Sequence, residues 1–222
     1  MKKLYFIPLL SIFACIVMGI VVRNSYTNDS QKIYNFEYGS CGAWDSVYQQ
    51  CGKFTSKDLI DKSDLIVKAK FNGERLITGN GFYSTVHISK IFKGDNDIKK
   101  DIIITEPVKI IVSTKFINPS YIPMCIPLQK DYEYIFLLKK IDFNEKRQLN
   151  DFQKNQYYPI TSSPAGYYRL GGQVQTKLFN FSKDKFKLNE LNGFDIYANK
   201  KEQLDIYYKY KGEVFKELGI NA

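Results

Sequence analysis

Apolar and polar positions alternate with a period of two along several stretches of the chain, the pattern of half-buried β-strands. The clearest case is residues 82–92, where Val86 and Ile88 fall on one face and His87, with the hydroxyl-bearing side chains of its neighbours, falls on the other. Lys93-Gly94-Asp95 follows and favours a tight turn. A phosphate-binding loop would instead lead into a helix N-terminus.

The same reading along the chain predicts short strands and a few helical pieces. Strands are predicted at 64–71, 102–105, 132–138, 167–170 and 173–181, with 108–114 as a continuation or a partner of 102–105. Helices are predicted at 55–60 and 201–218, a loop at 72–81, and a loop or an edge crossing at 118–127. Gly212 weakens the last helix. Short strands with turn clusters favour a mainly-β protein: a small closed barrel with peripheral helices.

The N-terminus carries one long apolar run. Met1-Lys2-Lys3 is followed by residues 4–22 without a charge, and then by Arg23. As a helix this run has a length of about 28 Å, close to the thickness of a hydrocarbon core. The lysines before it favour a cytoplasmic start, which predicts a single-pass transmembrane helix with the rest of the chain outside the cell membrane.

A cleaved signal peptide is the main alternative to this anchor, because a charged start and an apolar run fit it as well. Cleavage would make the protein secreted. A third interpretation is a lipoprotein, since Ile12-Phe13-Ala14-Cys15 faintly resembles a lipobox. All three interpretations export the remainder of the chain. We expect the organisation to be a signal anchor or signal peptide at 1–23, a polar stalk at 24–40, a barrel at 41–175, and a strand and helix extension packed on it at 176–222.

The number and spacing of charged residues indicate which partners the protein binds. The 222 residues carry 32 basic and 23 acidic side chains, for a formal charge of +9. These charges are interleaved, as at 181–190, whereas a nucleic-acid binder shows a concentrated basic stripe. We therefore expect the partners to be the membrane, through the N-terminal segment, and an envelope protein or polymer, with no nucleic acid.

Four segments resemble a known family in their order along the chain. They are S-D-L-I-V-K-A-K-F (63–71), Y-S-T-V-H-I-S-K-I-F-K-G-D (83–95), I-I-I-T (102–105) and P-L-Q-K-D-Y-E-Y-I-F-L-L (127–138). Together they resemble the netrin-like, OB-fold barrel of the N-terminal domain of tissue inhibitors of metalloproteinases, and related bacterial surface proteins. The segment 157–170 resembles the one that follows in the bacterial versions. The resemblance covers about residues 41–170 and implies an OB-like barrel.

The resemblance also implies an inhibitory mechanism. In the animal inhibitors, the α-amine and carbonyl of a first cysteine chelate the zinc of the target protease. The candidates here are Cys41 and Cys51, which lie well inside the chain and form no Cys-x-Cys motif. Unless processing cuts just before one of them, that chelate does not form. We therefore keep a proteinaceous metalloprotease inhibitor as the alternative function.

The resemblance further implies a disulfide. Cysteines near the start of the barrel are tied, in the family, to one in the loop before the last long strand, where Cys125 lies. Cys51–Cys125 is the pairing we expect, with Cys41–Cys125 as the alternative and Cys41–Cys51 as the third pairing. Such a bridge stabilises by about 2–4 kcal/mol.

No catalytic or metal-binding motif stands out. A catalytic cysteine would need a base, and His87 is the only histidine in the chain. We interpret His87 as an ordinary strand residue instead of a base or a metal ligand. Trp44, with Tyr38 and Tyr48, is a candidate aromatic platform for a ligand. We expect no cofactor, no metal and no enzymatic activity. The predicted function is a membrane-anchored, extracytoplasmic binding module.

Overall fold

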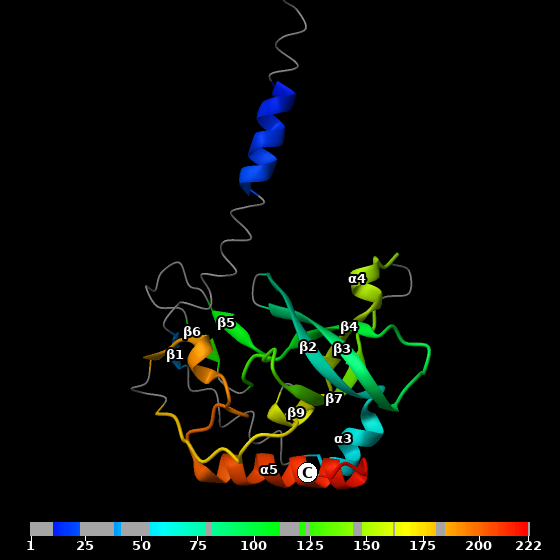
Figure 1. The fold of residues 1–222 in the computed structure, drawn as a ribbon, viewed down its shortest axis with the longest axis vertical. Helices are drawn as coiled ribbons and strands as arrows, with labels where there is room; N and C mark the ends of the chain where they lie inside the picture. The colour runs from blue at the N-terminus through cyan, green and yellow to red at the C-terminus, as the bar shows by residue number, and fades with distance from the viewer. Residues whose placement is uncertain are drawn as a thin grey trace, which may run out of the picture. The chain divides into compact units, whose positions relative to one another are not determined.

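The computed structural model describes residues 11–22, 38–40, 54–78, 81–111, 120–122, 125–143, 148–161, 163–180 and 185–221 (Figure 1). The chain divides into two compact units, Met1–Phe36 and Glu37–Ala222. In the first unit a helix spans 11–22, and its side chains are exposed. Within the described ranges, no helix has the length and the apolar character that a membrane crossing requires.

The second unit is mainly β. Its strands are β1 (Tyr38–Ser40), β2 (Leu65–Thr78), β3 (Gly81–Lys93), β4 (Asp101–Glu106), β5 (Lys109–Ile111), β6 (Ser120–Ile122), β7 (Glu133–Lys140), β8 (Gln156–Pro159), β9 (Tyr167–Arg169) and β10 (Lys185–Phe186). Its helices are α3 (Ser56–Lys62), α4 (Asp151–Lys154), α5 (Lys201–Glu217) and the 3₁₀ turns η1 (Pro164–Gly166) and η2 (Leu188–Leu191).

Five of these strands close into a barrel. Neighbours follow the order β2-β3-β4-β8-β7, and β7 pairs with β2 to complete the ring. Every pair is antiparallel except β4 and β8, which run parallel with Ile103 opposite Gln156. The prediction of a small closed barrel with peripheral helices is confirmed. The strand order fits the five-stranded OB-fold.

Burial explains why two of the barrel strands have different sequence patterns. Along β3 the side chains alternate between buried and accessible from Gly81 to Ile88, as the period of two predicts. Along β7 every residue from Tyr134 to Leu138 is buried. One face of β7 carries Tyr134 and Phe136, which meet the ring of Tyr167, and the other face is covered by α5.

The helix α5 covers one side of the barrel, next to α3 (Figure 1). Its buried side chains enter the same apolar cluster as residues of β2, β7 and β9. The members from α5 are Leu204, Tyr207, Val214 and Phe215, and those from the strands include Ile66, Ile135, Leu137 and Tyr168. The predicted amphipathic helix at 201–218 is confirmed as α5.

A second, smaller sheet has the order β10-β1-β6-β5. The predicted segment 108–114 therefore contains β5, which pairs with β6 in this sheet and does not continue β4. The prediction of a loop or edge at 118–127 is wrong for β6, since this strand lies between β1 and β5. Strand β1 ends the segment that was predicted as a stalk, and pairs with β10 near the C-terminus.

Two further predictions need correction. The predicted loop 72–81 is largely strand, because β2 continues to Thr78 through an irregularity at 71–75. There Gly73 takes φ +99° and the Asn72 side chain accepts the Glu74 N–H at 2.8 Å, so the turn residues form a bulge. The predicted strand 173–181 has no regular structure in its described part, which is held by the buried Gln175 side chain instead.

The turn after β3 depends on Gly94. Its φ is +121°, and a Cβ there would lie 2.8 Å from the Cδ1 atom of Leu65. Asp97 N–H donates to the Asp95 carboxylate at 3.2 Å. The stretch Lys93-Gly94-Asp95 is therefore a strand end and a tight turn, as predicted.

Candidate functional site

The outward side chains of β3 and β4 form one continuous surface of the barrel. The alternation that buries Phe82, Ser84 and Val86 leaves their sequence neighbours on the outside. Antiparallel pairing sets Tyr83 opposite Thr105, and His87 opposite Asp101. We call this surface the β3–β4 face.

Apolar side chains gather at one end of the β3–β4 face. Leu76 of β2 lies opposite Tyr83 and is 51% exposed. The Tyr83 ring in turn meets the ring of Phe152 from α4, with 5.8 Å between centroids. These three residues, named here the outer patch, bring together β2, β3 and the connection between β7 and β8.

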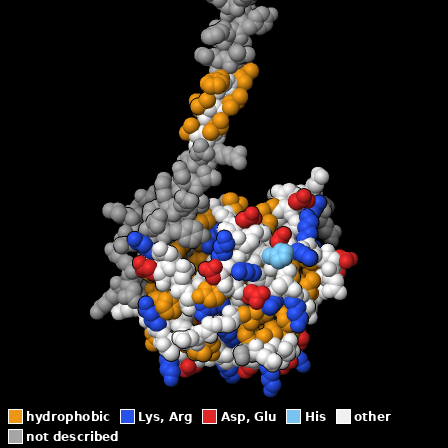
Figure 2. All heavy atoms as spheres, viewed as in Figure 1, with side chains coloured by type: hydrophobic (Ala, Val, Ile, Leu, Met, Phe, Trp, Pro, Cys, Tyr) orange, Lys and Arg blue, Asp and Glu red, His pale blue; other side chains and the backbone are white. Residues whose placement is uncertain are grey.

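Polar and charged groups occupy the rest of the β3–β4 face. His87 Nδ1 lies 2.9 Å from Asp101 Oδ1, and both side chains are more than half exposed. Lys70 lies opposite His87 on β2. Figure 2 shows basic and acidic side chains intermixed around the histidine, with apolar patches between them. An exposed pair of this kind contributes little to stability and presents both a donor and an acceptor to a partner.

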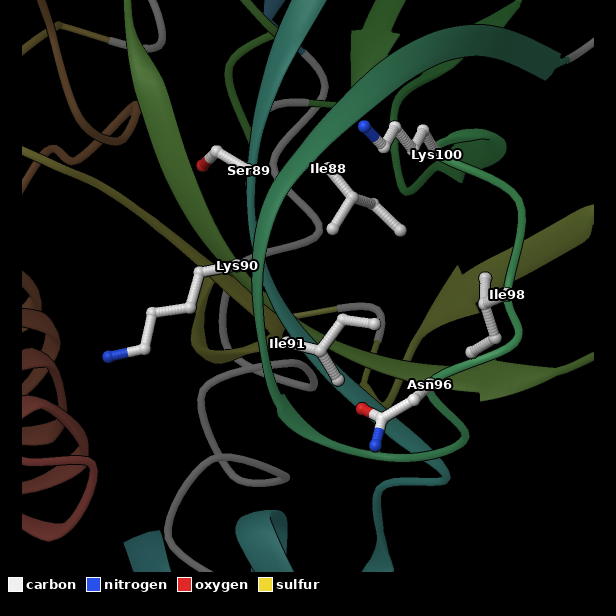
Figure 3. Close-up of a pocket in the computed structure, with 7 residues that line it drawn as sticks. All are labelled: Ile88, Ser89, Lys90, Ile91, Asn96, Ile98 and Lys100. Atoms are coloured by element: carbon white, nitrogen blue, oxygen red, sulfur yellow. The ribbon is translucent and has the colours of Figure 1, made fainter.

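A pocket of about 340 Å³ lies where β3 and β4 separate. Ile88 N–H donates to Lys100 C=O at 2.7 Å, and beyond this bond the loop 94–100 diverges from β3. Ile91, Asn96 and Ile98 point into the space between strand and loop, whereas Lys90 points away from it (Figure 3). The pocket thus has an apolar interior with a polar amide at one side.

Lys93, the last residue of β3, has structural partners in α3. Lys93 Nζ donates to Ile60 C=O at 2.9 Å and to Asp61 C=O at 2.7 Å, in the last turn of α3. A cation at this position satisfies carbonyls that a helix C-terminus leaves without intrahelical partners. Lys93 therefore joins α3 to the barrel and does not line the pocket.

A buried ion pair links β2 to β4. Arg75 Nη2 lies 2.7 Å from Glu106 Oε1, and the two side chains are 5% and 0% exposed. Glu106 also accepts from the Ser84 hydroxyl and, at 2.8 Å, from Leu128 N–H. Arg75 donates to Leu128 C=O at 2.7 Å. Both oxygens of this carboxylate are therefore bonded, and they tie β2 and β3 to the backbone at Leu128.

Comparison with known proteins adds no family. No family model matches the chain, and no curated protein matches it significantly.

The residues singled out from the sequence as sites are only partly described. Trp44 and Tyr48 lie outside the described residues, and so does the Tyr38 side chain, although the Tyr38 backbone pairs with Phe186 in the small sheet. Cys41 and Cys51 also lie outside. Cys125 is 1% exposed, and its backbone forms an isolated antiparallel β-bridge with Ile196. Because both predicted disulfide partners lie outside the described residues, the disulfide stays a prediction.

Sequence reasoning did not single out the outer patch or the buried ion pair, although the sequence carried a signal for the ion pair. Glu106 falls on the same face of its strand as Ile102 and Ile104, which are both fully buried. Strand alternation therefore indicated a buried charge that needed a partner. Within the part of the chain that the structure describes, no group of three or more histidine, cysteine or acidic residues is placed to hold a metal ion.

Proposed function

We propose that this protein is a non-catalytic binding module of the cell envelope. In this proposal the N-terminal segment anchors the chain in the cell membrane with the barrel outside. The β3–β4 face then contacts an envelope protein or polymer.

One observation carries the proposal: the outer patch lies on the surface that OB-type barrels use. These barrels bind along the face of their second and third strands, and along the loops after the first and fourth strands. In this chain those elements are β3, β4, the β2–β3 turn and the β7–β8 connection that carries α4. Tyr83 and Phe152 come from these elements, and Leu76 lies opposite Tyr83 near the end of β2. The exposed His87–Asp101 pair joins β3 to β4 on the same face.

The export of the barrel rests on the N-terminus. Residues 4–22 hold no charge, two lysines precede them, and Arg23 follows. The helix at 11–22 exposes large apolar side chains, among them Phe13 at 66% and Met18 at 69%. Such a surface is disfavoured in water and favoured in lipid.

The netrin-like identity of the barrel is part of the same proposal. It is supported by the order of the four resembling segments and by a strand order that fits an OB-fold. The alternative, a metalloprotease inhibitor, requires a mature chain that begins at Cys41 or Cys51. Sequencing the N-terminus of the mature protein separates the two, since a retained anchor leaves neither cysteine with a free α-amine.

Site-specific photo-crosslinking in whole cells tests the binding face. A photoreactive amino acid replaces His87, which is exposed on the β3–β4 face. The control carries the same amino acid at Asp205, an exposed position on α5. We expect a discrete crosslinked product from position 87 only. Digestion with protease or with cell-wall hydrolases then shows whether the product is a protein or a polymer.

Two results would count against the proposal. Equal crosslinking from positions 87 and 205 would show that the β3–β4 face has no preferred partner. Resistance of the barrel in intact cells to a membrane-impermeant labelling reagent would show that it is not displayed outside.

A further inference from the structure

A second hollow lies away from the β3–β4 face, between the loop at 171–174 and α5. Its volume is about 230 Å³, and α5 contributes Tyr208, Lys211, Gly212 and Phe215 to its lining. Val174 forms part of its rim and is 67% exposed. The lining is therefore mainly apolar, with one ammonium group.

This ammonium group shares a single carboxylate with another cation. Lys211 Nζ lies 3.6 Å from Asp195 Oδ2, while Arg169 Nε lies 2.7 Å from Asp195 Oδ1. The Asp195 carboxylate is 1% exposed and also accepts the Tyr208 hydroxyl at 2.7 Å. Among the described residues of this cluster, two cations and one anion leave one positive charge in excess. The Lys211 side chain is only 14% exposed, so water solvates this charge poorly.

The protonation chemistry agrees with this geometry. Burial lowers the pKa of Lys211 from its ordinary value, and the nearby Arg169 lowers it further, against the opposing effect of Asp195. The pKa of the neighbouring Tyr208 hydroxyl is shifted as well. Burial, followed by its hydrogen bond to Asp195, raises the pKa of Tyr208. An additional anion beside Lys211 would stabilise its charged form.

Gly212 lines the hollow. It lies inside α5, where glycine costs about 1 kcal/mol relative to alanine in helix stability. A Cβ at this position would meet no atom within 4 Å, so no close approach requires a glycine here. Gly172, on the opposite wall, has a different role. Its φ is +87°, and a Cβ there would lie 3.0 Å from the Arg169 guanidinium.

We propose that this hollow binds a small organic carboxylate. The carboxylate lies against the Lys211 ammonium and supplies the missing negative charge. The apolar body of the acid lies between Val174 and Phe215. The volume sets its size, since a cavity of roughly 150 Å³ holds one benzene molecule. An acid with a single aromatic ring or a short aliphatic chain matches a hollow of about 230 Å³.

The test is fluorine NMR of 4-fluorophenylacetate with the purified full-length chain, with a detergent-only blank. The neutral 4-fluorophenylacetamide has the same body without the charge. We expect broadening of the acid signal, competition by unlabelled phenylacetate, and a Kd on the order of 1 mM or below. The amide signal remains sharp, because it cannot pair with the ammonium group.

Four variants locate the site. Lys211→Met keeps the apolar stem and removes the charge, which weakens binding of the acid by about tenfold or more. Gly212→Leu fills the hollow and abolishes binding, whereas Gly212→Ala retains affinity within about twofold. Lys209→Met is the matched control, since this lysine is 71% exposed on the same helix and should leave binding unchanged. Circular dichroism confirms that each variant is folded.

Three results would overturn the proposal. They are absence of broadening with the acid at about 10 mM, equal broadening with the amide, and unchanged affinity in folded Lys211→Met. None of these results bears on the β3–β4 face, so this proposal and the proposed function succeed or fail separately.

Discussion

The buried ion pair of the barrel gives the sharpest prediction about stability. Replacing Arg75 by methionine keeps an apolar side chain against Phe71 and Phe82, whose ring centroids lie 4.6 Å and 5.3 Å from the Arg75 guanidinium. It leaves Glu106 with 0% exposure and without its cation. Only the Ser84 hydroxyl and the Leu128 N–H then remain as described partners.

The expected cost follows from that isolation. Removing one partner of a buried pair destabilises by about 3–5 kcal/mol, a large part of the ~5–15 kcal/mol that holds a typical domain. The double variant Arg75→Met with Glu106→Gln removes both charges and keeps an acceptor for Leu128 N–H. We expect it to recover about half of the loss or more, so that the double variant is more stable than Arg75→Met by roughly 2 kcal/mol.

Urea unfolding followed by circular dichroism measures these free energies. The matched control is Lys68→Met, which breaks an ion pair with Glu133 whose side chains are 31% and 42% exposed. Its cost is about 1 kcal/mol or less. If Arg75→Met cost no more than this control, the inference that Glu106 depends on its buried partner would be wrong.

Three further predictions follow from single positions. Gly94→Ala destabilises by ~1–3 kcal/mol in urea unfolding, since φ is +121° and a Cβ meets Leu65 at 2.8 Å. Gly212→Ala raises the unfolding free energy by about 0.5–1 kcal/mol, because its Cβ meets no atom within 4 Å. Partial burial raises the pKa of Asp64, but hydrogen bonds from Lys139 and the Lys140 N–H outweigh this effect and lower it overall. The Asp64 carboxylate therefore stabilises the fold above its unfolded pKa of about 4, and this stabilisation is lost as pH falls through the lower folded pKa. We expect Asp64→Asn to lower the unfolding free energy by under ~1 kcal/mol at neutral pH, and the difference from the unaltered chain to shrink in acid.

Local pattern was enough to predict the elements whose burial is simple. In β3 one face is buried and the other accessible, so the sequence alternates. In α5 one stripe packs on the barrel, so apolar residues recur at helical spacing. The turn at Gly94 was visible because a tight turn selects glycine.

The strand that joins β4 to β7 in the barrel, β8, was not predicted from the sequence. β8 has four residues and ends in Pro159. Its place is set by parallel pairing with β4, some fifty residues earlier in the chain, and by the Gln156 amide, which donates to the Thr105 hydroxyl at 2.9 Å. Contacts at such a sequence separation leave no periodic signal.

The opposite error at 173–181 has a physical cause as well. Its alternation resembles a strand, but the Gln175 side chain takes the place of a neighbouring strand. Its Oε1 accepts the N–H groups of Asp195 and Ile196 at 2.9 Å and 3.1 Å, and its Nε2 donates to Ile196 C=O at 2.9 Å. A side chain that bonds like a backbone cannot be recognised from hydrophobic periodicity.

The most direct test of the proposed function uses the envelope component captured by crosslinking at position 87. Its affinity is measured for the unaltered chain, for Leu76→Asp in the outer patch, and for Leu178→Asp as the control. The two leucines are 51% and 42% exposed, so neither change removes a buried side chain. We predict binding weakened by about tenfold or more for Leu76→Asp, and within about twofold for Leu178→Asp. Equal affinity of the two variants would contradict the assignment of the β3–β4 face as the binding surface.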